Sequence, residues 1–156
     1  MLPYVDIEGS GEGVTIITGK GSGNANHATV IGAANSEIRM LTIESVGYRW
    51  PEPQENYATA LSVPYYESQV LQQVTLLASN GLIVTRGIYA DGYLHDNGTP
   101  DPSDDWFEGS EVYLNSVSIN VVYNADIPVG AAPTVRGIHG YRGAFIDVND
   151  SSITTE

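Results

Sequence analysis

The sequence predicts an all-β protein made of a single antiparallel domain. Three observations lead to this fold class. β-Branched and aromatic residues gather in short runs that are mostly bounded by Gly, Pro, Asn or Asp, as strands usually are. No segment shows convincing helical periodicity. A chain of 156 residues has room for one core, whereas two independent domains would each lie near the lower size limit.

Strand-like runs can be placed along the whole chain, and the longer ones are expected to break in two. They cover residues 13–18, 38–46, 70–77, 82–89, 112–123 and 135–148. Within the fifth run, the alternation puts Val117, Ile119 and Val121 on one face and polar residues on the other. This pattern is typical of a half-buried antiparallel strand.

The dipeptide Asn80-Gly81 predicts a β-hairpin that joins residues 74–79 to residues 82–86. Asn-Gly is the pair that best tolerates the positive φ angles of a two-residue hairpin turn. The strands on its two sides are therefore expected to pair with each other.

Residues 87–111 are interpreted as a long loop that is rich in acidic side chains. Loops of more than about 12–15 residues in a compact domain are usually functional or disordered. The run 96–105 could wrap a calcium ion, which prefers hard oxygen ligands, and the carboxylates that would do so are Asp96, Asp101, Asp104 and Asp105. Because two prolines interrupt this run and it lacks EF-hand spacing, a solvated acidic loop is the alternative. No other cofactor is expected.

Charge and composition exclude several classes of partner. Six basic and nineteen acidic residues give a formal net charge of −13, which would repel nucleic acid and an anionic bilayer alike. No segment approaches the ~20 apolar residues of a membrane span, and there is no Cys for a disulfide or a thiolate site. We therefore expect a soluble protein with no nucleic-acid partner and no membrane span. Its compartment stays open, secretion included.

No catalytic motif is evident in the sequence. His27, His95 and His139 stand apart, and no His-Glu-x-x-His, Gly-x-Ser-x-Gly or Walker-type pattern occurs. Many carboxylates could in principle form a glycosidase pair, but nothing indicates which two would face each other. We expect that the protein is not an enzyme.

The most informative stretch is residues 135–147, in which glycines, cations and a carboxylate interrupt a strand-like run. Gly143 allows a tight turn that would leave the N–H groups of Ala144 and Phe145 free to point outward. Asp147 would add a carboxylate to the same concavity. Such a site suits a neutral polyol, whose hydroxyls both donate and accept. Alternatively, the glycines only shape a bulge or a turn.

This stretch resembles the last hairpin of jacalin-related lectins, where a glycine-rich segment leads into a Gly-x-x-x-Asp sugar-binding loop. The matching residues are Gly143 and Asp147, and residues 73–87 resemble the penultimate hairpin of that family. The resemblance implies a β-prism of three four-stranded sheets, no enzymatic activity and a shallow carbohydrate site. The N–H groups of Ala144 and Phe145 and the carboxylate of Asp147 would bind the sugar. A homo-oligomer is expected, because such lectins often gain avidity by multivalency.

Three functions from different classes remain open at this point. A lectin-like carbohydrate-binding module would use this loop, with Tyr141, Tyr93 or Trp106 offering an apolar face to the sugar ring. A structural or assembly protein, such as a coat, appendage or matrix component, is the second. A pore-forming toxin-like protein is the third, with residues 112–123 lining a barrel. A two-sheet β-sandwich would explain the same strand pattern as a prism. Carbohydrate binding is the function that we expect.

Overall fold

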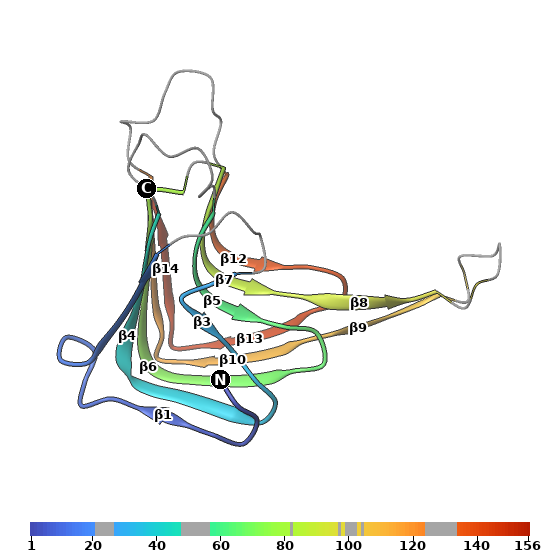
Figure 1. Cartoon of the computed structure of the whole chain (residues 1–156), viewed down its shortest axis with the longest axis horizontal. Coiled ribbons are helices and arrows are strands. Elements are labelled where there is room, and N and C mark those ends of the chain that lie inside the picture. The colour runs from blue at the N-terminus through green and yellow to red at the C-terminus, as the bar shows by residue number, and fades with distance from the viewer. Residues whose placement is uncertain are drawn as a thin grey trace.

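The computed structural model is a stack of bent parallel strands, the arrangement of a β-solenoid (Figure 1). The structure describes residues 1–20, 27–47, 57–81, 83–96, 98, 103, 105–123 and 134–156. Because strands and no α-helix occur among these residues, the prediction of an all-β protein is confirmed. The strands are β1 (Ile7–Glu8), β2 (Ile16–Lys20), β3 (Val30–Ile31), β4 (Ser36–Val46), β5 (Tyr57–Val63), β6 (Ser68–Ser79), β7 (Val84–Ala90), β8 (Gly92–His95), β9 (Trp106–Gly109), β10 (Glu111–Asn115), β11 (Ser118–Val122), β12 (Thr134–Gly140), β13 (Phe145–Asn149) and β14 (Ser152–Thr155).

The predicted antiparallel domain is wrong, both as a β-prism and as a β-sandwich. Sheet A has the order β1-β4-β6-β10-β13, extended by β2, β11 and β14, and sheet B has the order β12-β7-β5-β3. Every pair in these two sheets is parallel, and β8 with β9 is the antiparallel pair of the described residues. The chain passes from one sheet to the other and back, so that each strand of one sheet serves as the crossover connection of its partner sheet.

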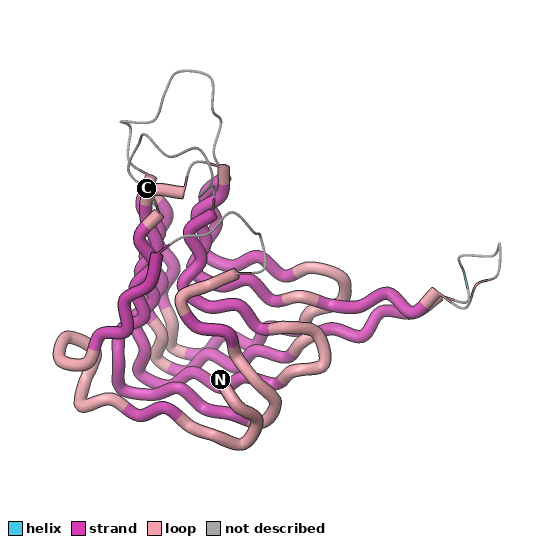
Figure 2. The backbone as a smooth tube through the Cα atoms, in the orientation of Figure 1, coloured by secondary structure: helices cyan, strands magenta, loops and turns pink. Residues whose placement is uncertain are grey.

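Both sheets are bent, and sheet B lies inside the bend of sheet A (Figure 2). In sheet A the bend falls at Met40, Gln73, Ser116 and Asp150, which all have positive φ angles of 47–56°. The strand register places these four residues at the same position of successive strands. A left-handed residue interrupts the extended backbone, so the row turns the sheet through its corner.

The hydrophobic core fills the space between the two sheets. Its side chains form rows along the stack, and in one row Ile43, Leu76 and Ile119 are neighbours in register and fully buried. Val117 and Val121 are buried with Ile119, which confirms the predicted apolar face of this run. The prediction that the same strand is antiparallel is wrong, since alternation fixes the buried face of a strand and not the direction of its neighbours.

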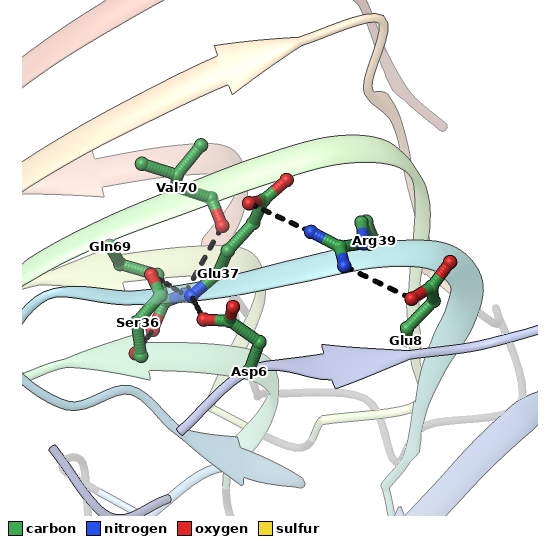
Figure 3. Close-up of polar contacts among 7 residues, drawn as sticks. All are labelled: Asp6, Glu8, Ser36, Glu37, Arg39, Gln69 and Val70. Atoms are coloured by element: carbon green, nitrogen blue, oxygen red, sulfur yellow. Dashed lines mark hydrogen bonds and ion pairs between the residues drawn. The ribbon is translucent and has the colours of Figure 1, made fainter. Parts of the chain in front are cut away.

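A buried amide links two neighbouring strands at one end of sheet A (Figure 3). The Gln69 side chain is 0% exposed, and its Nε2 donates to the carbonyl oxygens of Ser36 at 2.8 Å and Val70 at 3.2 Å. Its Oε1 accepts from the Ser36 hydroxyl at 3.0 Å. A buried amide is tolerated when donor and acceptor are both satisfied, so these bonds fix β4 against β6.

The turn at Asn80 and Gly81 does not form the predicted hairpin. Asn80 does have a positive φ of 61°, and the N–H of Gly81 donates to Thr85 Oγ1 at 3.0 Å. However, β6 belongs to sheet A, whereas β7 pairs with β5 and β12 in sheet B. The turn therefore connects two sheets, because a left-handed residue suits a solenoid corner as well as a hairpin.

An antiparallel hairpin of β8 and β9 projects away from the solenoid between β7 and β10 (Figure 1). We call this hairpin the arm. The predicted loop over residues 87–111 is therefore wrong in part, since it contains the end of β7 and both strands of the arm. Within the described part of the chain, no helix is long and apolar enough to cross a membrane.

Candidate functional site

The concave side of the bend in sheet B forms a groove of about 350 Å³. We call it the elbow groove. Neighbouring strands place its side chains in register, with Val84 beside Thr134, Arg86 beside Arg136, and Tyr89 beside His139. The groove therefore crosses the strands and follows the stacking direction of the solenoid. Its lining comes from β5, β7, β12 and the turn after β12: Tyr57, Val84, Arg86, Tyr89, Thr134, Arg136, His139 and Tyr141.

Two glycines explain why sheet B can bend at this point. A Cβ added to Gly87 would collide with Cγ2 of Ile119, and one added to Gly137 would collide with Cγ2 of Ile153. Sheet B thus approaches β11 and β14 so closely that only glycine fits. The preceding side chains, Arg86 and Arg136, line the elbow groove.

Arg86 forms the floor of the groove and is only 2% exposed. Its guanidinium carbon lies 4.3 Å from the ring centre of Tyr89 and 5.8 Å from that of Tyr57, the geometry of cation–π contacts. Its Nη1 lies 3.3 Å from Nδ1 of His139. Because a guanidinium only donates, Nδ1 must be the acceptor, and the imidazole proton is then on Nε2.

His139 stays neutral near pH 7 because its surroundings oppose a further positive charge. Burial lowers the pKa of His139, and Arg136 and Arg86 lower it further, while Asp91 acts in the opposite direction. Burial likewise lowers the pKa of Arg86, although a guanidinium keeps its charge in proteins. The elbow groove therefore combines two fixed positive charges with a neutral imidazole and tyrosine hydroxyls.

Comparison with protein-family models, with curated proteins and with solved structures finds no match to the chain. The function therefore has to be inferred from the site. The aromatic faces of the groove can stack on the apolar face of a ring, and its hydroxyls and guanidinium groups can bind polar substituents. Among the described residues, no three His, Asp or Glu side chains are grouped so that they could hold a metal ion.

The predicted sugar-binding loop lies outside the groove, and of its residues only Tyr141 lines it. Gly143 has a positive φ of 79°, as a tight turn requires. The prediction that the following N–H groups are free is wrong, because Ala144 donates to the carbonyl oxygen of Tyr141 at 3.4 Å and Phe145 to that of Ser110 at 2.9 Å.

The base of the arm fills the concavity that the sequence suggested. A Cβ on Gly109 would collide with the carbonyl oxygen of Gly143, and one on Gly92 with that of Arg142. The backbone of the turn thus packs directly on the arm. Asp147 lies in β13 of sheet A, half-buried and in register with Tyr113, rather than beside the turn.

Tyr93 and Trp106 belong to an aromatic cluster on the arm. The Trp106 ring stacks on that of His95 at 3.6 Å between centroids and 5° between planes. Nε2 of His95 lies 2.8 Å from the Tyr66 hydroxyl and 3.2 Å from Glu108 Oε2. Tyr66 comes from the turn between β5 and β6, so these contacts hold the arm against the body of the solenoid.

The structure describes two of the four carboxylates that were predicted to bind calcium. Asp101 and Asp104 lie outside the described residues. Asp96 follows β8 and is exposed, and its Oδ1 accepts the N–H of Gly98 at 2.7 Å, which is a local turn contact. Asp105 precedes β9 and is half-buried.

Three groove residues, Tyr57, Arg86 and Tyr89, were not predicted as site residues, although the sequence contains a signal for two of them. The segment Arg86-Gly87-Ile88-Tyr89 recurs as Arg136-Gly137-Ile138-His139. In the structure the two segments lie side by side in register. An Arg-Gly-Ile-aromatic repeat therefore marks one glycine of the bend and two groove residues on each of two adjacent strands.

Proposed function

We propose that this protein binds carbohydrate and that the glycan lies in the elbow groove. The observation that carries the proposal is the lining of this groove by three tyrosines and two arginines. Aromatic rings stack on the apolar faces of sugars, while hydroxyls and guanidinium groups bind their polar substituents. An extended glycan along the groove would meet a new strand about every 4.8 Å, so that successive sugars contact equivalent positions.

A binding experiment with three variants tests the proposal and its location. Tyr141 is 44% exposed at the groove, Tyr4 is 77% exposed elsewhere, and Asp147 belongs to the alternative loop. Glycan-array screening followed by titration calorimetry should show that Tyr141→Ala weakens binding up to about tenfold, as expected for one aromatic contact. Tyr4→Ala and Asp147→Ala should bind like the unmodified protein.

Two outcomes would contradict the proposal. If no glycan binds the unmodified protein, carbohydrate binding is wrong. If Asp147→Ala abolishes binding while Tyr141→Ala leaves it unchanged, the protein is a lectin but the glycan occupies the loop at residues 143–147.

Self-assembly is a second candidate function, and one specific observation favours it. Val148 and Ile153 align with the buried core residues Leu114 and Ile119, yet they are 44% and 48% exposed. No described strand pairs with the outer side of β13 or β14. A second copy that adds its own strands to this edge would cover both side chains. Light scattering should then show concentration-dependent oligomers that Ile153→Lys reduces, and a monomer at all concentrations would contradict assembly.

A further inference from the structure

An arginine in a chain this acidic has many carboxylates available as ion-pair partners. Arg39 shows this on sheet A, where its guanidinium binds Glu8 at 3.0 Å and Glu37 at 3.1 Å (Figure 3). The chain has nineteen acidic residues for six basic ones, so partners are abundant. The exposed Arg142 packs instead on the ring of Tyr141, 4.9 Å from its centre, so an exposed arginine with neither kind of contact needs a separate explanation.

Arg136 is such a residue. It is exposed on β12, and no described side chain forms a hydrogen bond or ion pair with it. Its neighbour in register is Arg86, and like charges directly opposite each other on adjacent strands are destabilising. The structure thus brings two positive charges together at a net charge of −13 without neutralising the exposed one.

We propose that the elbow groove selects glycans that carry an anionic group, and that Arg136 binds this group while the buried Arg86 adds a second positive charge behind it. The inference rests on the proposed glycan-binding function. A guanidinium presents donors in a planar fork that matches a carboxylate or sulfate with two parallel hydrogen bonds. The anion would neutralise Arg136 and offset the repulsion that it experiences from Arg86.

The contacts of Arg86 make the site specific for an anion rather than for any polar group. Its guanidinium contacts the rings of Tyr57 and Tyr89, and its Nη1 lies 3.3 Å from Nδ1 of His139. These contacts hold the guanidinium in place, and its field acts on a ligand in the groove together with that of Arg136. A neutral sugar substituent gains much less from this field than an anionic one does.

Matched polymers separate this inference from the proposed function. Calorimetry would compare polygalacturonate, its fully methyl-esterified form, a neutral galactan and a sulfated galactan. We expect the anionic polymers to bind about ten- to a hundredfold more tightly than the ester and the galactan, with an affinity that falls as salt is added. Binding of polygalacturonate alone would assign a carboxylate, and binding of the sulfated polymer alone would assign a sulfate.

Arg136→Gln and Arg39→Gln form a matched pair of variants, because each removes one positive charge, in the groove and away from it respectively. Arg136→Gln should lower the affinity for the anionic polymer to that for its neutral counterpart, whereas Arg39→Gln should leave the preference intact. Equal binding of polygalacturonate and its ester would overturn the anion inference and leave glycan binding standing. Binding of none of the four polymers, in a protein that also fails on the glycan array, would overturn the proposed function itself.

Discussion

Replacement of the buried Gln69 amide by a carboxylate should destabilise the protein strongly. In Gln69→Glu an oxygen takes the place of Nε2, which donates to the carbonyl oxygens of Ser36 at 2.8 Å and Val70 at 3.2 Å. Two hydrogen bonds of about 1 kcal/mol each are lost, and a buried charge without a partner costs about 3–5 kcal/mol. We therefore expect a loss of about 3–5 kcal/mol at pH 7, because the carboxyl can escape part of the total by taking up a proton.

Urea unfolding followed by circular dichroism measures this loss, and Gln72→Glu is the matched control. Gln72 lies on the same strand but is exposed, so its change should stay within about 0.5 kcal/mol. Burial raises the pKa of the introduced carboxyl in the folded state, so the deficit of Gln69→Glu should shrink as the pH is lowered toward 5. Equal stabilities of the two variants would refute the buried position of Gln69 and the register of β4 and β6.

Gly87→Ala should lower the free energy of unfolding by about 1–3 kcal/mol in the same assay, because the added Cβ would collide with Ile119 at the bend. Gly13→Ala is the control, since a Cβ at Gly13 meets free space, and it should cost much less. Equal losses of stability in the two variants would contradict the close approach of the sheets. The pKa of His139 is lowered from its ordinary value of 6.5 in the folded protein. The unmodified protein should therefore lose stability relative to the His139→Gln variant as the pH falls below about 6.5. Parallel profiles of unfolding free energy against pH for the two proteins would contradict this. Arg39→Gln should leave the stability nearly unchanged, since its ion pairs are partly exposed to solvent, and a loss as large as that of Gly87→Ala would contradict this.

The strand content and several breaks could be predicted from the sequence, because they depend on local patterns. Residues 112–123 do divide into β10 and β11, and residues 135–148 into β12 and β13. The predicted inward face of β11 is also correct, since an alternating pattern reports directly on burial. What the pattern does not contain is the identity of the neighbouring strand, so the direction of pairing could not be obtained from it.

The solenoid repeat could not be recognised in the sequence, because its corner depends on a backbone conformation that several residue types adopt. The equivalent positions Met40, Gln73, Ser116 and Asp150 share a left-handed φ and no side-chain chemistry. Strand β5 was also missed, since six of its seven residues are buried, which removes the alternation that marks a half-buried strand. The arm adds a further irregularity, because its insertion makes the spacing of the corner residues unequal.

Part of the candidate site could be predicted from the sequence. Residues 135–147 do supply Arg136, His139 and Tyr141 to the elbow groove, but the prediction chose the turn that follows them. The N–H groups of that turn are not free, because the arm packs on the turn and the carbonyl oxygen of Ser110 accepts the N–H of Phe145. Both the arm and Ser110 are distant from the turn in the sequence. Such a contact is set by the stacking of strands and leaves no mark in the local sequence.

Chemical-shift mapping of the backbone amides during titration with an oligogalacturonate shows whether an anionic glycan binds in the elbow groove. We expect the largest changes over residues 86–89 of β7 and over residues 136–141 of β12 and the turn after it, the two segments that contain Arg86, Tyr89, Arg136, His139 and Tyr141 of the elbow groove. Changes concentrated at residues 143–147, with none in the groove, would show that the elbow groove is not the binding site.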